Sequence, residues 1–207
     1  MNKYWHLEAQ DENEAEGPTM MAGSSEDSRV SAEHNRIYFY SGVTRKDNLS
    51  LNKLIHATGH KLANIQQIYK LDDPPKIRLH INSYGGSVFA GFGSVDYIRT
   101  CPVPVVSVID GCAASAATIM SVVAHERLMH EHAFMLIHQL SSGMWGKFEE
   151  MKDDMKNNEL LMKKIIGIYE EHTNIPKSKI KDILKRDIWW DAKTCLKYGL
   201  VDDIITP

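Results

Sequence analysis

The run VPVVSVIDGCAASAATIM, residues 103–120, carries the strongest indication of the fold. Its β-branched first half predicts a buried strand over VVSVI, and its Ala-rich second half predicts a short apolar helix after a sharp turn. Ser115 falls in the first turn of that helix, where backbone N–H groups lack intrahelical partners. Such a position suits a nucleophile, because free N–H groups hold the oxyanion that forms when a hydroxyl attacks a carbonyl.

A histidine follows in a second apolar run, MLIHQ, at residues 135–139. His138 lies 23 residues after Ser115 and is a candidate base, so the pair suggests a serine hydrolase. Taken alone, the Ala-Ser-Ala string is better explained by close packing of a helix on a sheet. A lone histidine at a strand end is likewise more often structural. The motif also differs from the GxSxG elbow, because Gly111 lies four residues before the serine.

Two further segments contain candidate functional groups. SYGGSVFAG, residues 83–91, places a glycine pair after a strand, and its exposed amides suit either an oxyanion pocket or a plain tight turn. It has neither the GxGxxG nor the GK[ST] spacing of nucleotide sites. Asp191 is expected to cap a helix, whereas Asp187 has no equally clear structural role and could orient a histidine.

Strands and helices are expected to alternate along most of the chain. Residues 36–42 and 76–82 read as strands, as do ERLMH and AFMLIH. Helical periodicity runs from about 51 to 69 and over 88–99 and 147–172, a short helix ends at Gly199, and residues 200–206 form the last strand. The pattern predicts a largely parallel sheet wrapped by helices. The apolar side of the helix over 147–172 is expected to meet another subunit.

Composition narrows the function classes. The 207 residues carry a net charge of -3 and no basic run, which argues against nucleic acid, and no apolar run is long enough to span a membrane. The three cysteines are scattered and His130 and His132 lack metal-ligand spacing, so no metal site is expected. Residues 1–33 are acidic and rich in small residues, and we expect a flexible segment or a propeptide.

Four strings together change the interpretation: INSYGGSV, DGCAASAAT, MLIHQ and KRDIWWDAKTCLKYGLVDDI. In order and spacing they resemble the Clp protease proteolytic subunit family, whose members usually show INSPGGSV, a GxAAS turn, MIHQP and an ending with RD and YGLVD. The resemblance covers about residues 36 to 205. It implies a crotonase-like α/β fold for a peptidase domain over 34–207, with a projecting handle helix at about 147–172.

The resemblance also implies roles for individual residues. The family's nucleophile, base and orienting aspartate fall on Ser115, His138 and Asp187. Its two oxyanion donors fall on the backbone amides of Gly86 and Ala116, and its ring-contact arginine falls on Arg186.

The function implied is a serine endopeptidase that cleaves unfolded polypeptides or short peptides inside a homo-oligomer of stacked seven-membered rings. A Clp-type ATPase would feed it, so ATP is used only by that partner and this chain binds no cofactor. A cytoplasmic location is expected, or the host cytoplasm or an organelle stroma for a phage-encoded or organellar member. The alternative in the same fold is a catalytically silent ring subunit. A crotonase-type acyl-CoA enzyme would need a carboxylate base near the amides, and a serine–lysine peptidase would need a lysine in the matched strings.

The sequence departs from the family pattern at several positions. Tyr84 replaces the proline before the glycine pair, Leu140 replaces the proline after HQ, and Ser141 and Ser142 stand where glycines are common. These changes line the expected substrate groove, together with SSGMWG at 141–146, and so bear on cleavage preference. The chain between the first and second strands is also several residues longer than usual, where family members build the rim that receives the ATPase.

Overall fold

A computed structural model describes residues 29–206, and within them the strands form one eight-stranded, mostly parallel sheet. Its main order is β1-β2-β3-β4-β5-β8, and β6 pairs with both β4 and β7. The strands are β1 (Val30–Glu33), β2 (Arg36–Phe39), β3 (Ile77–Ser83), β4 (Val105–Ala114), β5 (Glu126–His130), β6 (Phe134–Leu136), β7 (Trp190–Asp191) and β8 (Asp203–Ile205).

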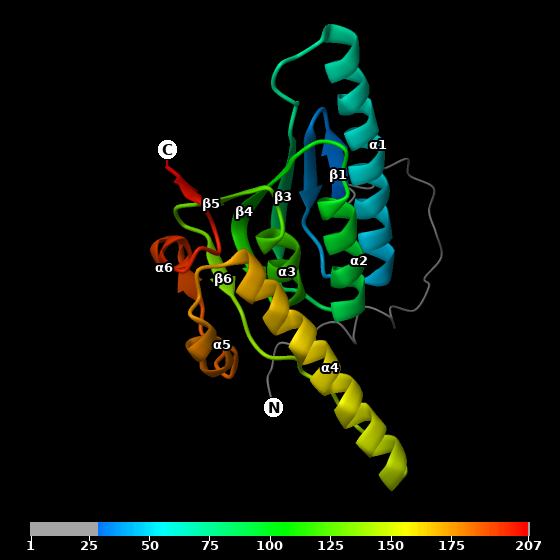
Figure 1. The fold of residues 1–207 in the computed structure, drawn as a ribbon, viewed down its shortest axis with the longest axis vertical. Coiled ribbons are helices and arrows are strands. Elements are labelled where there is room, and N and C mark those ends of the chain that lie inside the picture. Colours follow the sequence, from blue (N-terminus) through cyan, green and yellow to red (C-terminus); the bar gives the residue numbers. More distant parts are fainter. Residues whose placement is uncertain (1–28, 207) are drawn as a thin grey trace, which may run out of the picture.

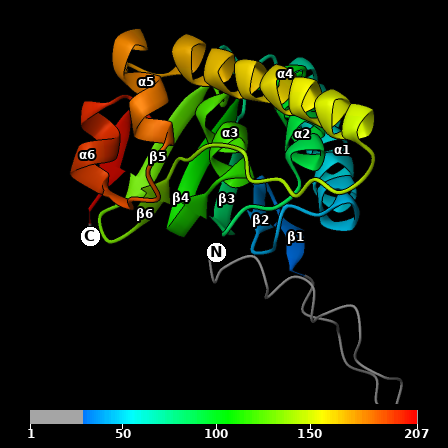
Figure 2. The same ribbon diagram turned by 90° about the horizontal axis from the view of Figure 1, so that it is seen from below.

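The helices gather mainly on one face of this sheet. They are α1 (Arg45–Tyr69), α2 (Val88–Arg99), α3 (Ala116–Val122), α4 (Phe148–His172), α5 (Lys177–Leu184) and α6 (Ala192–Lys197). Figure 2 shows α1, α2, α3 and α4 stacked on the same side of the strands, with α5 and α6 beyond β6. The expected architecture of a mostly parallel sheet covered by helices is therefore confirmed.

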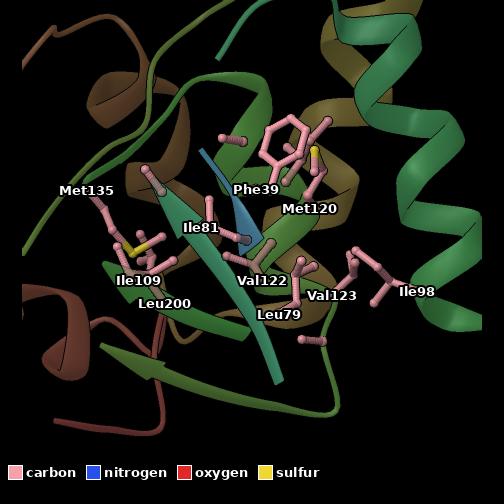
Figure 3. Close-up of a cluster of buried hydrophobic side chains, with 14 of the residues drawn as sticks. Phe39, Leu79, Ile81, Ile98, Ile109, Met120, Val122, Val123, Met135 and Leu200 are labelled. Atoms are coloured by element: carbon pink, nitrogen blue, oxygen red, sulfur yellow. The ribbon is translucent and has the colours of Figure 1, made fainter. Parts of the chain in front are cut away.

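The core lies between the sheet and these helices (Figure 3). Ile81 and Ile109 from the central strands are fully buried and belong to the same cluster as Met120 of α3. Leu51 and Ile55 from α1 bury the face predicted from its apolar spacing. None of the described helices combines the length and apolar character needed to cross a membrane.

The central strand is longer than the sequence indicated, and this moves the turn. β4 continues to Ala114, whereas we expected a strand over VVSVI that ended at Ile109. Gly111 adopts φ 82°, and the pairing with β3 shifts there, so two residues of β3 span four residues of β4. We expected the chain to turn where this shift in the strand pairing occurs. The turn lies instead at Ser115, immediately before α3.

The beginning of the described part of the chain also differs from the expectation. Val30–Glu33, assigned from composition to the flexible segment, forms β1 and pairs antiparallel with β2. Only Val30 of this strand is buried, and the small or polar residues Ser31, Ala32 and Glu33 gave the segment the composition of a linker. Residues 1–28, the rest of the expected propeptide or flexible segment, lie outside the described residues.

Most predicted helix ends are confirmed, but α1 begins at Arg45, six residues before the expected start at about 51, and α5 was not predicted. α2 spans the predicted residues, and Asp191 caps α6 by accepting a hydrogen bond from the Thr194 N–H. α4 begins one residue after the predicted start. Its buried residues all come from its C-terminal half, and its N-terminal half projects from the rest of the chain (Figure 1). The SSGMWG segment before it contains no strand.

Candidate active site

Ser115 occupies the junction between β4 and α3 in an unusual backbone conformation. Its φ of 54° and ψ of -126° lie outside the regions that non-glycine residues normally adopt. The surroundings hold it there: its N–H donates to the carbonyl of Leu136 at 2.9 Å, and its carbonyl accepts from the Thr118 N–H and hydroxyl. Strained residues of this kind concentrate at functional sites, so the geometry is consistent with a nucleophile.

The glycine turn after β3 packs directly against this serine. Gly85 adopts φ 93°, and a Cβ on it would lie 2.7 Å from Cβ of Ser115 and 2.6 Å from the carbonyl oxygen of Ala114. Gly86 follows with φ 145°. Ala116 is the first residue of α3, so its N–H belongs to the helix-start donors without an intrahelical acceptor. The backbone amides of Gly86 and Ala116, the two predicted oxyanion donors, therefore directly follow the two residues that meet in this close contact, Gly85 and Ser115.

His138 and Asp187 are brought together by the pairing of β6 with β7. The two strands are antiparallel, with Met135 opposite Trp190, and the same register continued by three residues sets position 138 against 187. Nδ1 of His138 lies 3.1 Å from Oδ1 of Asp187. The histidine side chain is only 8% exposed and the aspartate 53%, so the pair is buried at its histidine end.

Burial sets the protonation state of the histidine. It lowers the pKa of His138 from its ordinary value, and the opposing effect of the Asp187 charge and hydrogen bond does not reverse this. The imidazole is therefore neutral near pH 7, which is the form that accepts a proton. Asp187 at Nδ1 favours the tautomer in which Nε2 is the acceptor.

The serine and the histidine–aspartate pair follow adjacent strands. Ala114 pairs with Leu136, so Ser115 directly follows the end of β4 while His138 lies two residues beyond the end of β6. The hydrogen bond from the Ser115 N–H to Leu136 links the two segments. The segment after His138 is held in turn by the Gln139 N–H, which donates to the Leu184 carbonyl at the end of α5. Three distant parts of the sequence thus converge at the carboxyl ends of β4 and β6.

The remaining predicted positions are Arg186 and the segment over residues 141–146. Arg186 is exposed beside Asp187 and lines a cavity of about 270 Å³, and its expected ring contact stays a prediction. The other cavity residues are Ile137, Lys179, Asp182, Ile183, Ile188 and Trp190. Residues 141–146 are exposed throughout, with Trp145 at 98%. Among residues 29–206, no group of three or more His, Cys, Asp and Glu side chains is arranged to hold a metal ion.

A polar network on the other face of the sheet was not predicted. Asp110, expected to belong to a turn, accepts hydrogen bonds from the Tyr40 hydroxyl and from Nδ1 of His80, both at 2.8 Å. Nε2 of His130, one of the two histidines that lack metal-ligand spacing, lies 3.2 Å from the same carboxylate. The pairing of β2, β3, β4 and β5 in register creates the cluster. The alternation of side chains along each strand could have predicted that these four residues lie on this face of the sheet. It could not have predicted that they lie next to one another.

Comparison with known proteins agrees with this mixed α/β architecture. The sequence model of the Clp protease family matches residues 20–207. The ATP-dependent Clp protease proteolytic subunit 1 of Chlamydia pneumoniae is 34% identical over 181 residues, which cover 84% of this chain and 87% of that protein. The ATP-dependent Clp protease proteolytic subunit of Deinococcus radiodurans is 30% identical over 63% of this chain and 65% of its own length. The chain belongs to the Clp protease family.

Proposed function

We propose that the chain is a serine endopeptidase in which Ser115, His138 and Asp187 form the catalytic triad. The observation that carries the proposal is the contact of the buried His138 with the more exposed Asp187, because His138 follows the strand end that accepts the Ser115 backbone hydrogen bond. The lowered pKa of His138 supports its role as base, because a neutral imidazole is available near pH 7. The strained backbone of Ser115 and the glycine turn against it support the nucleophile and oxyanion assignments.

The reaction follows from these positions. His138 takes the hydroxyl proton of Ser115 as the oxygen attacks a peptide carbonyl, and the backbone amides of Gly86 and Ala116 hold the oxyanion. The imidazolium then protonates the departing amine, which leaves an acyl group on the serine. Water, activated by the same imidazole, releases the acyl group and restores the hydroxyl. Asp187 keeps the imidazole in the productive tautomer and stabilises its charged form.

The proposal extends to an assembly of stacked seven-membered rings that encloses the sites and receives polypeptides from an ATP-dependent unfoldase. The names of the two relatives above include the word ATP-dependent. We propose that a partner protein, and not this chain, uses the ATP. Exposed Phe148, Met151 and Met155 on the projecting half of α4 support a contact between copies, because apolar side chains on a projecting helix gain from burial. A cytoplasmic location stays a prediction.

Cleavage of a fluorogenic peptide by the purified chain tests the proposal. We expect Ser115→Ala and His138→Ala to abolish cleavage while the mass of the native assembly stays unchanged. Cleavage at the wild-type rate by Ser115→Ala would overturn the assignment of the nucleophile. An assembled wild-type protein without any peptidase activity would favour the silent ring subunit instead.

A further inference from the structure

Two aromatic side chains meet beside the candidate active site. Tyr84 precedes the glycine pair, and Trp189 belongs to the loop that carries Asp187. Their ring centroids lie 6.3 Å apart with an interplanar angle of 88°, an edge-to-face contact. Tyr84 is 74% exposed and Trp189 38%, so both rings keep a large free surface. Neither ring takes part in the proton transfers proposed above, so the contact calls for another explanation.

The strand register places the two aromatic residues at the level of the site. Ala114, the residue before the nucleophile, pairs with Leu136. Continuing the neighbouring pairs by one residue sets Tyr84 beside Ala114. The same step sets Trp189 beside Leu136. The two rings therefore approach one another across Ala114 of β4 and Leu136 of β6, and Ala114 contributes only a methyl group to this surface.

Trp189 lies on the side of the site that holds the base, whereas Tyr84 adjoins the glycine turn that packs against Ser115. Trp189 follows Asp187 by two residues, and Asp187 contacts Nδ1 of His138. In the mechanism above, the imidazole protonates the departing amine, so the departing half of the substrate lies on the histidine side. On this ground we place the substrate residue immediately after the scissile bond next to Trp189, with Tyr84 completing the surface from the side of the glycine turn.

Resting on the proposed endopeptidase function, we infer that Tyr84 and Trp189 form the subsite for the side chain of the residue immediately after the scissile bond. Two partly exposed aromatic surfaces favour an apolar occupant, because burying apolar area and edge-to-face ring contacts are both stabilising. The subsite selects peptides with Phe, Tyr, Leu or Met after the cleaved bond over those with Gly or Asp. The tyrosine that replaces the family's usual proline at position 84 then has a role in cleavage preference.

The test uses fluorogenic peptides that differ only in the residue after the scissile bond. With the full-length wild-type chain, we expect kcat/KM for the Phe peptide to exceed that for the Gly peptide by about tenfold or more. Tyr84→Ala should remove most of this preference, whereas Tyr84→Phe should keep it because the ring remains. Tyr69→Ala is the matched control: it removes a tyrosine of similar exposure, 71%, at the end of α1, and should keep the full preference.

Covalent labelling of Ser115 by a fluorophosphonate separates this inference from the proposed function. A wild-type chain that is neither labelled nor active overturns the endopeptidase function, and the subsite with it. If all variants are labelled at the wild-type rate and Tyr84→Ala still shows the wild-type preference, only the subsite is overturned. Slower labelling of Tyr84→Ala, with the Phe preference intact, would identify Tyr84 as a positioning residue for the glycine turn, which also overturns the subsite.

Discussion

Gly85 has no room for a side chain beside the nucleophile. A methyl group there would meet Cβ of Ser115 at 2.7 Å and the Ala114 carbonyl at 2.6 Å, at a φ of 93° that side chains rarely adopt. Both neighbours belong to the buried strand–helix junction, so neither moves without disturbing the nucleophile. A side chain at position 85 would therefore suffer both from the unfavourable backbone conformation and from these close contacts.

We therefore predict that Gly85→Ala lowers the free energy of unfolding by about 1–3 kcal/mol and slows fluorophosphonate labelling of Ser115. Gly167→Ala is the control, because its added methyl group meets nothing within 4 Å and lies inside α4. That substitution should stabilise the chain slightly, since alanine favours a helix more than glycine does. Chemical denaturation gives both values, and an unchanged labelling rate in Gly85→Ala would contradict the close contact.

The depressed pKa of His138 makes a prediction about pH. The imidazole is a base only when neutral, so kcat/KM should rise with pH through an apparent pKa below the ordinary 6.5 and stay level above it. Asp187→Asn should reduce kcat by about 10⁴-fold, because the productive tautomer is no longer favoured. A pH series of peptide cleavage tests both points, with Asp182→Asn as a control carboxylate on the neighbouring helix α5. An acid limb well above pH 6.5 would contradict the account.

At the scale of the elements, a single carboxylate links four strands of the sheet. Asp110 on β4 accepts from Tyr40, just beyond β2, and from His80 on β3, and it lies near His130 on β5. Burial acts to raise the pKa of Asp110, but the hydrogen bonds from His80 and Tyr40 outweigh it and lower the pKa. The ionised carboxylate thus stabilises the fold, and its loss should weaken the face of the sheet that the helices leave uncovered.

We expect Asp110→Asn to lower the free energy of unfolding by about 1–3 kcal/mol at neutral pH. Because the folded-state pKa is depressed, this contribution is present above the unfolded value of about 3.9 and is lost as the pH falls through the folded-state pKa. Melting temperatures of wild type and variant should therefore converge in acid. Asp96→Asn, an exposed aspartate on α2, should change stability little at any pH. A constant difference between wild type and Asp110→Asn down to pH 2 would contradict the linkage.

Helices and strands with regular periodicity were predictable, and the elements that bear the site were less so. The spacing of Leu51, Ile55 and Leu62 predicted α1, and Asp191 was recognisable as a cap. The continuation of β4 past Gly111 was not, because a glycine after an aspartate ordinarily indicates a turn. Residues 112–114 stay extended because they pair with β3 and β6. The position of the turn at Ser115 therefore depends on contacts with distant strands, which the sequence around the turn does not reveal.

On the scale of the whole molecule, the projecting half of α4 is the clearest sign of assembly. Its buried residues lie beyond position 164, while Phe148, Met151 and Met155 are exposed. The sequence predicted this helix and its apolar side from spacing alone. The candidate residues Ser115, His138 and Asp187 were identified from motif order, whereas the partners of Tyr84 and Asp110 depend on strand register and could not be read from the chain.

We predict that replacing Met151 and Met155 together with lysine shifts the native mass from the full assembly to smaller species, because charge would replace apolar contact between copies. Asn157→Lys, at an exposed polar position on the same helix, is the control and should leave the mass unchanged. Native mass spectrometry measures both variants, and circular dichroism checks that the fold is kept. A full-size assembly in the double variant would exclude this face of α4 as the contact.

The account as a whole depends on Ser115 being a nucleophile activated by His138, and covalent labelling measures this most directly. The wild-type chain is treated with a fluorophosphonate, and the modified peptide is located by mass spectrometry. The account predicts one adduct on Ser115, no adduct in Ser115→Ala, and labelling slowed at least about a hundredfold in His138→Ala. Labelling of a different serine in the wild type, or an undiminished rate in His138→Ala, would contradict it.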